Sequence, residues 1–122
     1  MTVPSRSDPR SHLPLKPVEL HLLLALAEGE LHGYGLVQAI AERTDDLIRL
    51  EPGNLYRVIR RLLKVGLVAE SRRRAAPDLD DERRRYYRVT GLGERVTAAE
   101  LRRLRALVSS PTARALVRKR AT

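Results

Sequence analysis

The chain has 122 residues, which is enough for one domain with a modest hydrophobic core. Its 24 Lys and Arg residues outnumber its 15 Asp and Glu residues, and the resulting net charge of +9 favours a polyanionic partner. The sequence has no cysteine, which excludes disulfides, zinc–thiolate sites and cysteine nucleophiles.

Residues 1–14 are predicted to form a flexible N-terminal arm. Three prolines lie there among Ser and Arg residues, and the segment has little to bury. Its two arginines, Arg6 and Arg10, could touch DNA outside a main binding site. An inert tail is the alternative interpretation.

Two helices are predicted to follow the arm. Residues 17–28 begin with a proline and are apolar nearly all round, and such a helix needs burial on two sides. A second subunit that covers Leu20 and Leu24 would provide this burial, and a central core helix is the alternative. Residues 33–43 predict the second helix, and the branched side chains of residues 47–50 predict a short strand.

Residues 52–65 predict an amphipathic helix that opens with a proline and ends before Gly66. Its inward positions recur at helical spacing: Leu55, Ile59 and Leu62. Its other face carries four cations: Arg57, Arg60, Arg61 and Lys64. Four cations on about two turns would repel one another unless something anionic faces them. A helix with one apolar and one cationic face suits docking in the major groove of DNA.

Residues 67–74 and 83–90 predict the two strands of a β-hairpin, because apolar and polar residues alternate in the second segment. The connecting loop is acidic, and arginines flank it on both strands: Arg72, Arg73, Arg74, Arg83, Arg84 and Arg85. Arginine-rich wings read the shape of a minor groove. We therefore expect the strand arginines, and not the acidic tip, to contact DNA.

Residues 91–109 predict a long amphipathic helix, for which Thr90 is a suitable N-cap. A DNA-binding fold does not require this helix, and its aliphatic stripe suggests dimerisation. The stripe consists of Leu101, Leu104, Leu107 and Val108. Pro111 ends the helix, and residues 112–119 could add one or two further helical turns.

Three helices followed by a β-hairpin is the order of a winged helix-turn-helix. We therefore predict a mainly α fold with a small β-hairpin wing. The DNA-binding domain is expected over residues 15–90, and a C-terminal dimerisation helix with a tail is expected over residues 91–122.

Several short blocks, in the right order, resemble the PadR family of bacterial transcriptional regulators over roughly residues 15–107. They are His32–Gly33–Tyr34, Pro52–Gly53–Asn54–Leu55–Tyr56, Gly66–Leu67–Val68 and Arg84–Arg85–Tyr86–Tyr87–Arg88–Val89–Thr90. The resemblance implies a homodimeric winged-helix repressor that inserts paired recognition helices into successive major grooves of an operator. It also implies release by a small, often aromatic, effector near the dimer interface. In two respects the chain differs from the family: Asn54 stands where Thr or Ser is more common, and no Phe or Trp is present to stack on a flat ligand.

The candidate DNA contacts lie on the cationic helix, on the wing strands and at the start of the second helix. They are Tyr34, Asn54, Tyr56, Arg57, Arg60, Arg61, Lys64, Arg72, Arg73, Arg74, Arg84 and Arg85. We expect Asn54 or Arg57 to contact base edges. The other residues are expected to bind the DNA backbone, which positions the protein. A solvated charged face is the alternative interpretation.

No metal site, cofactor or enzymatic activity is predicted. The spacing of the three histidines fits no helical metal pair, and His32 is expected to cap or pack at the second helix. The sequence has no phosphate-binding glycine loop and no plausible buried acid–base pair.

These observations predict a sequence-specific, homodimeric transcriptional repressor that binds duplex DNA. Two alternatives stay open: a protein-interaction module whose basic face docks an acidic partner, and a non-specific DNA-binding protein. No apolar run reaches the roughly 18 residues that a membrane span needs, and the opening segment lacks an apolar signal core. We therefore expect a cytoplasmic location and no membrane partner.

Overall fold

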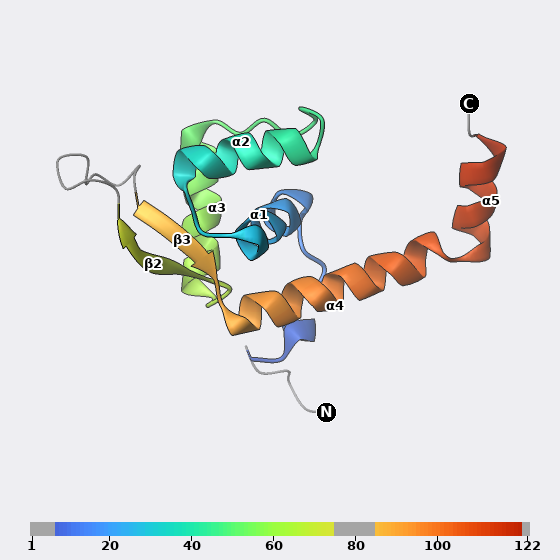
Figure 1. The fold of residues 1–122 in the computed structure, drawn as a ribbon. Coiled ribbons are helices and arrows are strands. Elements are labelled where there is room, and N and C mark those ends of the chain that lie inside the picture. Colours follow the sequence, from blue (N-terminus) through green and yellow to red (C-terminus); the bar gives the residue numbers. More distant parts are fainter. Residues whose placement is uncertain (1–6, 75–84, 121–122) are drawn as a thin grey trace.

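A computed structural model describes residues 7–74 and 85–120 of the chain (Figure 1). Its helices are the 3-10 helix η1 (Pro9–His12), α1 (Pro17–Glu28), α2 (Gly33–Arg43), α3 (Pro52–Lys64), α4 (Gly91–Val108) and α5 (Pro111–Lys119). Its strands are β1 (Leu31–His32), β2 (Val68–Arg74) and β3 (Arg85–Val89). The predicted winged helix-turn-helix order is confirmed, and the helix boundaries agree with the sequence prediction to within one residue for α1 to α4.

The sheet has three antiparallel strands in the order β1-β3-β2. The hairpin of β2 and β3 is the wing, and β1 pairs with the other edge of β3 through Leu31 opposite Tyr87. The prediction of a strand at residues 47–50 was wrong. Asp45 and Asp46 turn the chain there with φ angles of 49° and 64°, and Leu47 is left 86% exposed. The Ile48 backbone N–H donates to the Thr44 hydroxyl at 3.0 Å, so this segment is tied to the end of α2 and not to the sheet.

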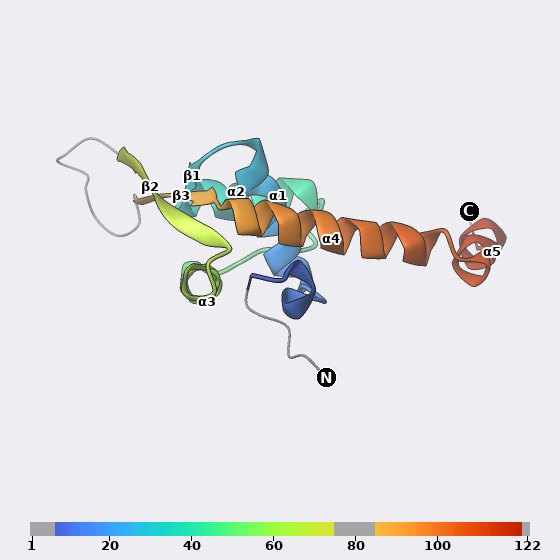
Figure 2. The ribbon, with the colours of Figure 1, turned by 90° about the horizontal axis from the view of Figure 1, so that it is seen from below.

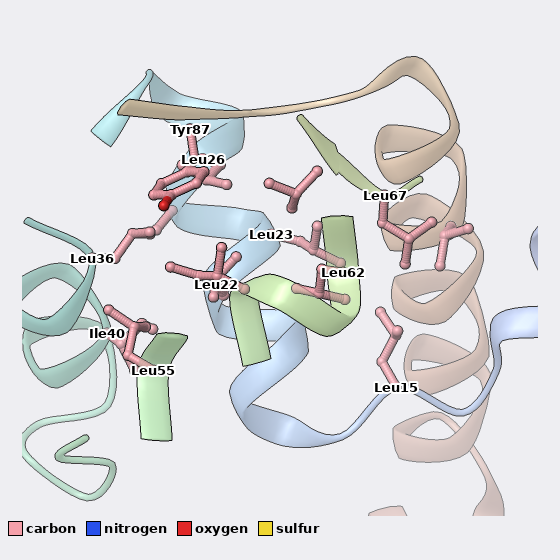
Figure 3. Packing of buried hydrophobic residues seen from close by; sticks show 14 residues of the cluster. Leu15, Leu22, Leu23, Leu26, Leu36, Ile40, Leu55, Leu62, Leu67 and Tyr87 are labelled. Carbon is pink, nitrogen blue, oxygen red and sulfur yellow. The ribbon is translucent and has the colours of Figure 1, made fainter. Parts of the chain in front are cut away.

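The core lies between α1, α2, α3, the sheet and the first half of α4 (Figure 3). It is built almost entirely from aliphatic side chains, with Tyr87 as its one fully buried aromatic ring among the described residues. The buried apolar residues of α1 are Leu22, Leu23, Ala25 and Leu26. α1 packs against α2, α4 and β3, so the burial that its apolar sequence needs comes largely from its own chain.

The orientation of α3 follows from its three buried residues, Leu55, Ile59 and Leu62. Pro52 occupies the first turn, where its missing N–H costs no hydrogen bond. Gly66 follows the helix with a φ angle of 83°, a left-handed conformation that glycine adopts without strain. The chain then enters β2 directly, so α3 and the wing are joined by a short, defined turn.

Residues 7–14 differ from the flexible arm that the sequence predicts. They include the 3-10 helix η1, which lies against α4, and they lead into the buried side chain of Leu15. The Leu15 backbone N–H donates to Glu100 Oε2 at 2.7 Å, and Arg103 Nε donates to Glu100 Oε1 at 2.5 Å. This long-range anchor orders a segment that has little apolar surface of its own. Residues 1–6 of the predicted arm lie outside the described residues.

α4 projects away from the winged domain and carries α5 at its far end (Figure 2). Thr90 caps α4 as predicted, since its hydroxyl accepts from the Gly93 N–H at 3.0 Å. α5 is a separate helix of nine residues, capped by Ser110. Within the described part of the chain, no helix is long and apolar enough to cross a membrane.

Gly93 lies where the start of α4 meets the turn between α3 and β2. A Cβ at this position would lie 2.1 Å from the Leu67 carbonyl oxygen and 2.7 Å from Val89 Cγ2. Backbone atoms cannot move aside without shifting the turn. We expect Gly93→Ala to lower the free energy of unfolding by about 2 kcal/mol or more in urea titration. Gly53→Ala is the control, because a Cβ there meets nothing within 4 Å and should leave stability unchanged or higher. Equal stability of the two variants would contradict the close approach at Gly93.

Glu100 is only 1% exposed, and its pKa lies below the ordinary glutamate value because Arg103 and the Leu15 N–H bind the ionised form, against the opposing effect of burial. A pKa lowered by folding means that the ionised group stabilises the fold above the unfolded-state pKa of about 4.3. This contribution is lost as the pH falls through the folded-state pKa.

We therefore expect Glu100→Gln to lower the free energy of unfolding by about 1–3 kcal/mol at neutral pH. The difference from the wild type should shrink as the pH falls below the unfolded-state pKa of about 4.3 and through the lower folded-state pKa. Urea unfolding at a series of pH values checks this, with the exposed Glu42→Gln as the control. A difference that stays constant across the acidic range would contradict the anchor.

Candidate nucleic-acid interface

The exposed face of α3 gathers most of the predicted DNA contacts on one surface. Arg57, Arg60 and Lys64 are exposed, and none of them forms an ion pair with any described residue. Asn54 is exposed in the first turn, where the free N–H groups of a helix N-terminus favour an anion. We define Asn54, Arg57, Arg60 and Lys64 as the α3 face.

Arg61 differs from the other α3 cations. Its Nη2 atom forms an ion pair with Glu19 Oε2, and Glu19 is 2% exposed in the first turn of α1. The other oxygen of the same carboxylate, Glu19 Oε1, accepts from the Lys16 backbone N–H at 2.8 Å. The sequence prediction grouped Arg61 with the DNA contacts, whereas in the free protein its guanidinium is bound to a buried carboxylate.

Tyr34 and Tyr56 lie on the α2 side of the α3 face. The Tyr56 ring packs closely on Gly33, since a Cβ at Gly33 would lie 2.5 Å from the Tyr56 hydroxyl oxygen. Tyr34 is 66% exposed, and its hydroxyl accepts from Gln38 Nε2 at 3.2 Å. The two tyrosines help to line an apolar cavity of about 300 Å³, together with Gly33, Val37, Pro52 and Leu55. His32 caps α2 as predicted, because its Nδ1 accepts from the Gly35 N–H at 3.0 Å.

The wing arginines are only partly described. Arg72 is exposed, and Arg85 is exposed with its Nε atom 3.7 Å from Glu70 Oε1 across the two strands. The structure assigns Arg73 and Arg74 to β2 without describing their side chains. Arg84, Arg83 and the acidic loop between the strands lie outside the described residues. Contact between the wing arginines and DNA therefore stays a prediction.

The candidate dimer contacts fall into two groups. Leu20 and Leu24 on α1 are half-buried within the chain, as is Leu104 on α4. Leu101, Leu107 and Val108 are exposed on the part of α4 that extends beyond the winged domain. Leu116 and Val117 of α5 are exposed as well, and Val108 and Val117 line one cavity between α4 and α5. Together with Leu101, Leu107 and Val108 these are five side chains that are between 41% and 70% exposed. We define these five residues as the α4–α5 apolar face.

The Transcriptional regulator PadR-like family model matches residues 22–99, which span α1 to the middle of α4. The chain belongs to this family. It is a transcriptional regulator and not an enzyme, as the sequence predicts.

Relatives with similar sequence or structure agree with this PadR-like assignment. Transcriptional regulator Rv3488 of Mycobacterium tuberculosis is 33% identical over 90 residues, which cover 74% of this chain and 78% of that protein. A transcriptional regulator from Clostridium thermocellum matches with a TM-score of 0.63 and 23% identity over 98% of this chain and 100% of the other. Bacillus subtilis PadR, solved in complex with operator DNA, matches with a TM-score of 0.59 and 19% identity. That match covers 70% of this chain and 47% of the PadR chain.

Sequence reasoning missed two residues of this PadR-like regulator, Glu19 and Glu100. Both are fully buried carboxylates, and each is bound by an arginine and by a backbone N–H at the start of α1. An acidic residue within the apolar run of α1 was an available signal for Glu19, because a buried charge requires a partner. Among the described residues, no group of three His, Cys, Asp or Glu side chains could hold a metal ion.

Proposed function

We propose that this PadR-like regulator is a homodimeric repressor that binds a pseudo-palindromic DNA operator through α3. The observation that carries the proposal is the α3 face, which exposes three cations that form no ion pair with the described residues. Such a face releases counterions when it meets phosphates, which gives affinity that falls steeply with salt. The complex of Bacillus subtilis PadR with operator DNA supports an operator as the ligand.

The proposed contacts divide into two kinds. Asn54 and Arg57 lie near the N-terminal end of α3, where recognition helices reach base edges. An asparagine can pair with adenine and an arginine with guanine in the major groove. Arg60, Lys64 and the wing arginines are proposed to bind phosphates, which positions the protein without reading sequence.

Charge reversal on α3 tests DNA binding. We expect Arg57→Glu combined with Lys64→Glu to weaken binding to a duplex from the protein's own promoter region by at least about tenfold at low salt. Fluorescence anisotropy with a labelled duplex measures this. Arg102→Glu combined with Arg105→Glu makes the same change in net charge on exposed positions of α4, and it should leave the affinity much closer to wild type. Unchanged affinity in the α3 variant would instead favour a protein-interaction module.

The proposed dimer rests on the α4–α5 apolar face. Water-exposed aliphatic side chains gathered on an element that projects from the domain are typical of an interface. A second copy would cover this face and place two α3 helices on the same duplex. Recognition helices paired in this way bind half-sites about one DNA turn apart.

Polar substitution on the α4–α5 apolar face tests the dimer. We expect Leu107→Glu combined with Val117→Glu to shift the protein towards monomer in sedimentation equilibrium, because burying two carboxylates without partners is costly. Operator affinity should fall with it, since one α3 helix replaces two. Leu47→Glu is the control, because Leu47 is also an exposed aliphatic residue but lies on the loop before α3, outside the α4–α5 apolar face. A monomeric wild type, or a variant that stays dimeric, would contradict the proposed interface.

We also propose that the regulator acts in the cytoplasm. We further propose that it binds a small-molecule effector. A cavity of about 460 Å³ lies between α4 and α5, lined by Val108, Arg114, Val117 and Arg118. Its apolar and cationic lining suits a small anionic organic molecule, and its position beside the proposed interface would link binding to dimer geometry.

A further inference from the structure

The ion pair between Arg61 and Glu19 ties the recognition helix to the start of α1. Arg61 is seven residues after Asn54, so the two side chains lie on the same side of α3, two turns apart. Its side chain is 52% exposed, so part of it stays open to solvent while Nη2 is bound to Glu19. Arg61 is therefore placed to reach a phosphate and is restrained by a carboxylate.

We propose that Glu19 withholds Arg61 from DNA and thereby lowers the sequence-independent part of the affinity. The inference rests on the proposed function, because it assumes that the α3 face binds duplex DNA. It makes Glu19 a specificity-determining residue, although its carboxylate contacts no base.

The charge balance of the pair supports this role. A guanidinium bound to a carboxylate is neutralised before DNA arrives, so its approach to a phosphate releases no further counterion. If Arg61 moved to a phosphate, the Glu19 charge would stay buried without its cation, which is strongly unfavourable. Arg57, Arg60 and Lys64 have no such restraint from any described residue.

The restraint affects specific and non-specific binding differently. Phosphate contacts strengthen binding to every sequence alike, whereas base contacts strengthen binding to the operator alone. Removing one cation from the phosphate-binding set therefore lowers the background affinity and leaves the contribution of base contacts unchanged. Glu19 also fixes α3 on α1, so the same carboxylate that reduces the background helps to hold the reading residues in place.

The slope of log affinity against log salt concentration tests the proposal with a random-sequence duplex. Arg60→Gln should reduce the slope by about 0.9 for each protomer bound, because it removes a cation that is proposed to bind phosphate. Glu19→Gln should increase the slope by about 0.9 for each protomer bound, because it frees Arg61. Between 50 and 200 mM KCl, the affinity of Glu19→Gln should therefore fall by a factor about threefold larger, for each protomer bound, than the affinity of the wild type. Glu28→Gln is the matched control, since it removes the same charge from the other end of α1 and frees Arg43, which is not on α3.

The double variant Glu19→Gln/Arg61→Gln guards against loss of folding, because it replaces the ion pair with two neutral amides and leaves no buried charge without a partner. Its salt slope should equal that of the wild type, and its thermal unfolding by circular dichroism should be cooperative. A double variant whose slope falls as much as that of Arg60→Gln, or Glu19→Gln with a wild-type slope, would overturn the inference. No change of slope in Arg60→Gln would contradict DNA binding by α3 itself, which separates failure of the proposed function from failure of the inference.

Discussion

Burial of Leu55, Ile59 and Leu62 in the core is the contact on which the rest of the structure depends. These three side chains fix the rotation of α3 about its own axis, and the rotation forces Arg57, Arg60 and Lys64 to face outward. Placing three cations side by side in water is unfavourable without an anion nearby. The free energy of the apolar contact offsets this repulsion, so the core maintains a surface that is suited to a polyanion.

The start of α1 connects this surface to the helix proposed to dimerise. Two successive backbone N–H groups, those of Leu15 and Lys16, donate to two different buried carboxylates. Glu100 belongs to α4 and is bound by Arg103, whereas Glu19 is bound by Arg61 of α3. One short stretch of backbone thus holds α3 and α4 in a fixed relation. In a dimer built through α4, this relation would set the spacing between the two recognition helices.

The sequence predicted the parts of the structure that local pattern determines. Helical spacing, prolines at first turns and Gly66 defined α3, and the same kind of signal defined α1, α2 and α4. The strand at residues 47–50 failed because β-propensity does not reveal the turn at Asp45 and Asp46 or the bond from the Ile48 N–H to the Thr44 hydroxyl. The two residues of β1 carry no strand pattern of their own. The order of residues 7–14 and the pairing of Arg61 depend on Glu100 and Glu19, whose partners are 85 and 42 residues away. No periodicity within a helix can encode contacts at those separations.

The outward face of α3 is the surface that we propose binds duplex DNA. Backbone ¹⁵N chemical shifts, followed while a duplex from the protein's own promoter region is added, test this proposal most directly. The largest changes are predicted at the amides of α3 between Gly53 and Lys64 and at the start of α2. Changes confined to α4 and α5, with α3 unaffected at saturating duplex, would contradict the account.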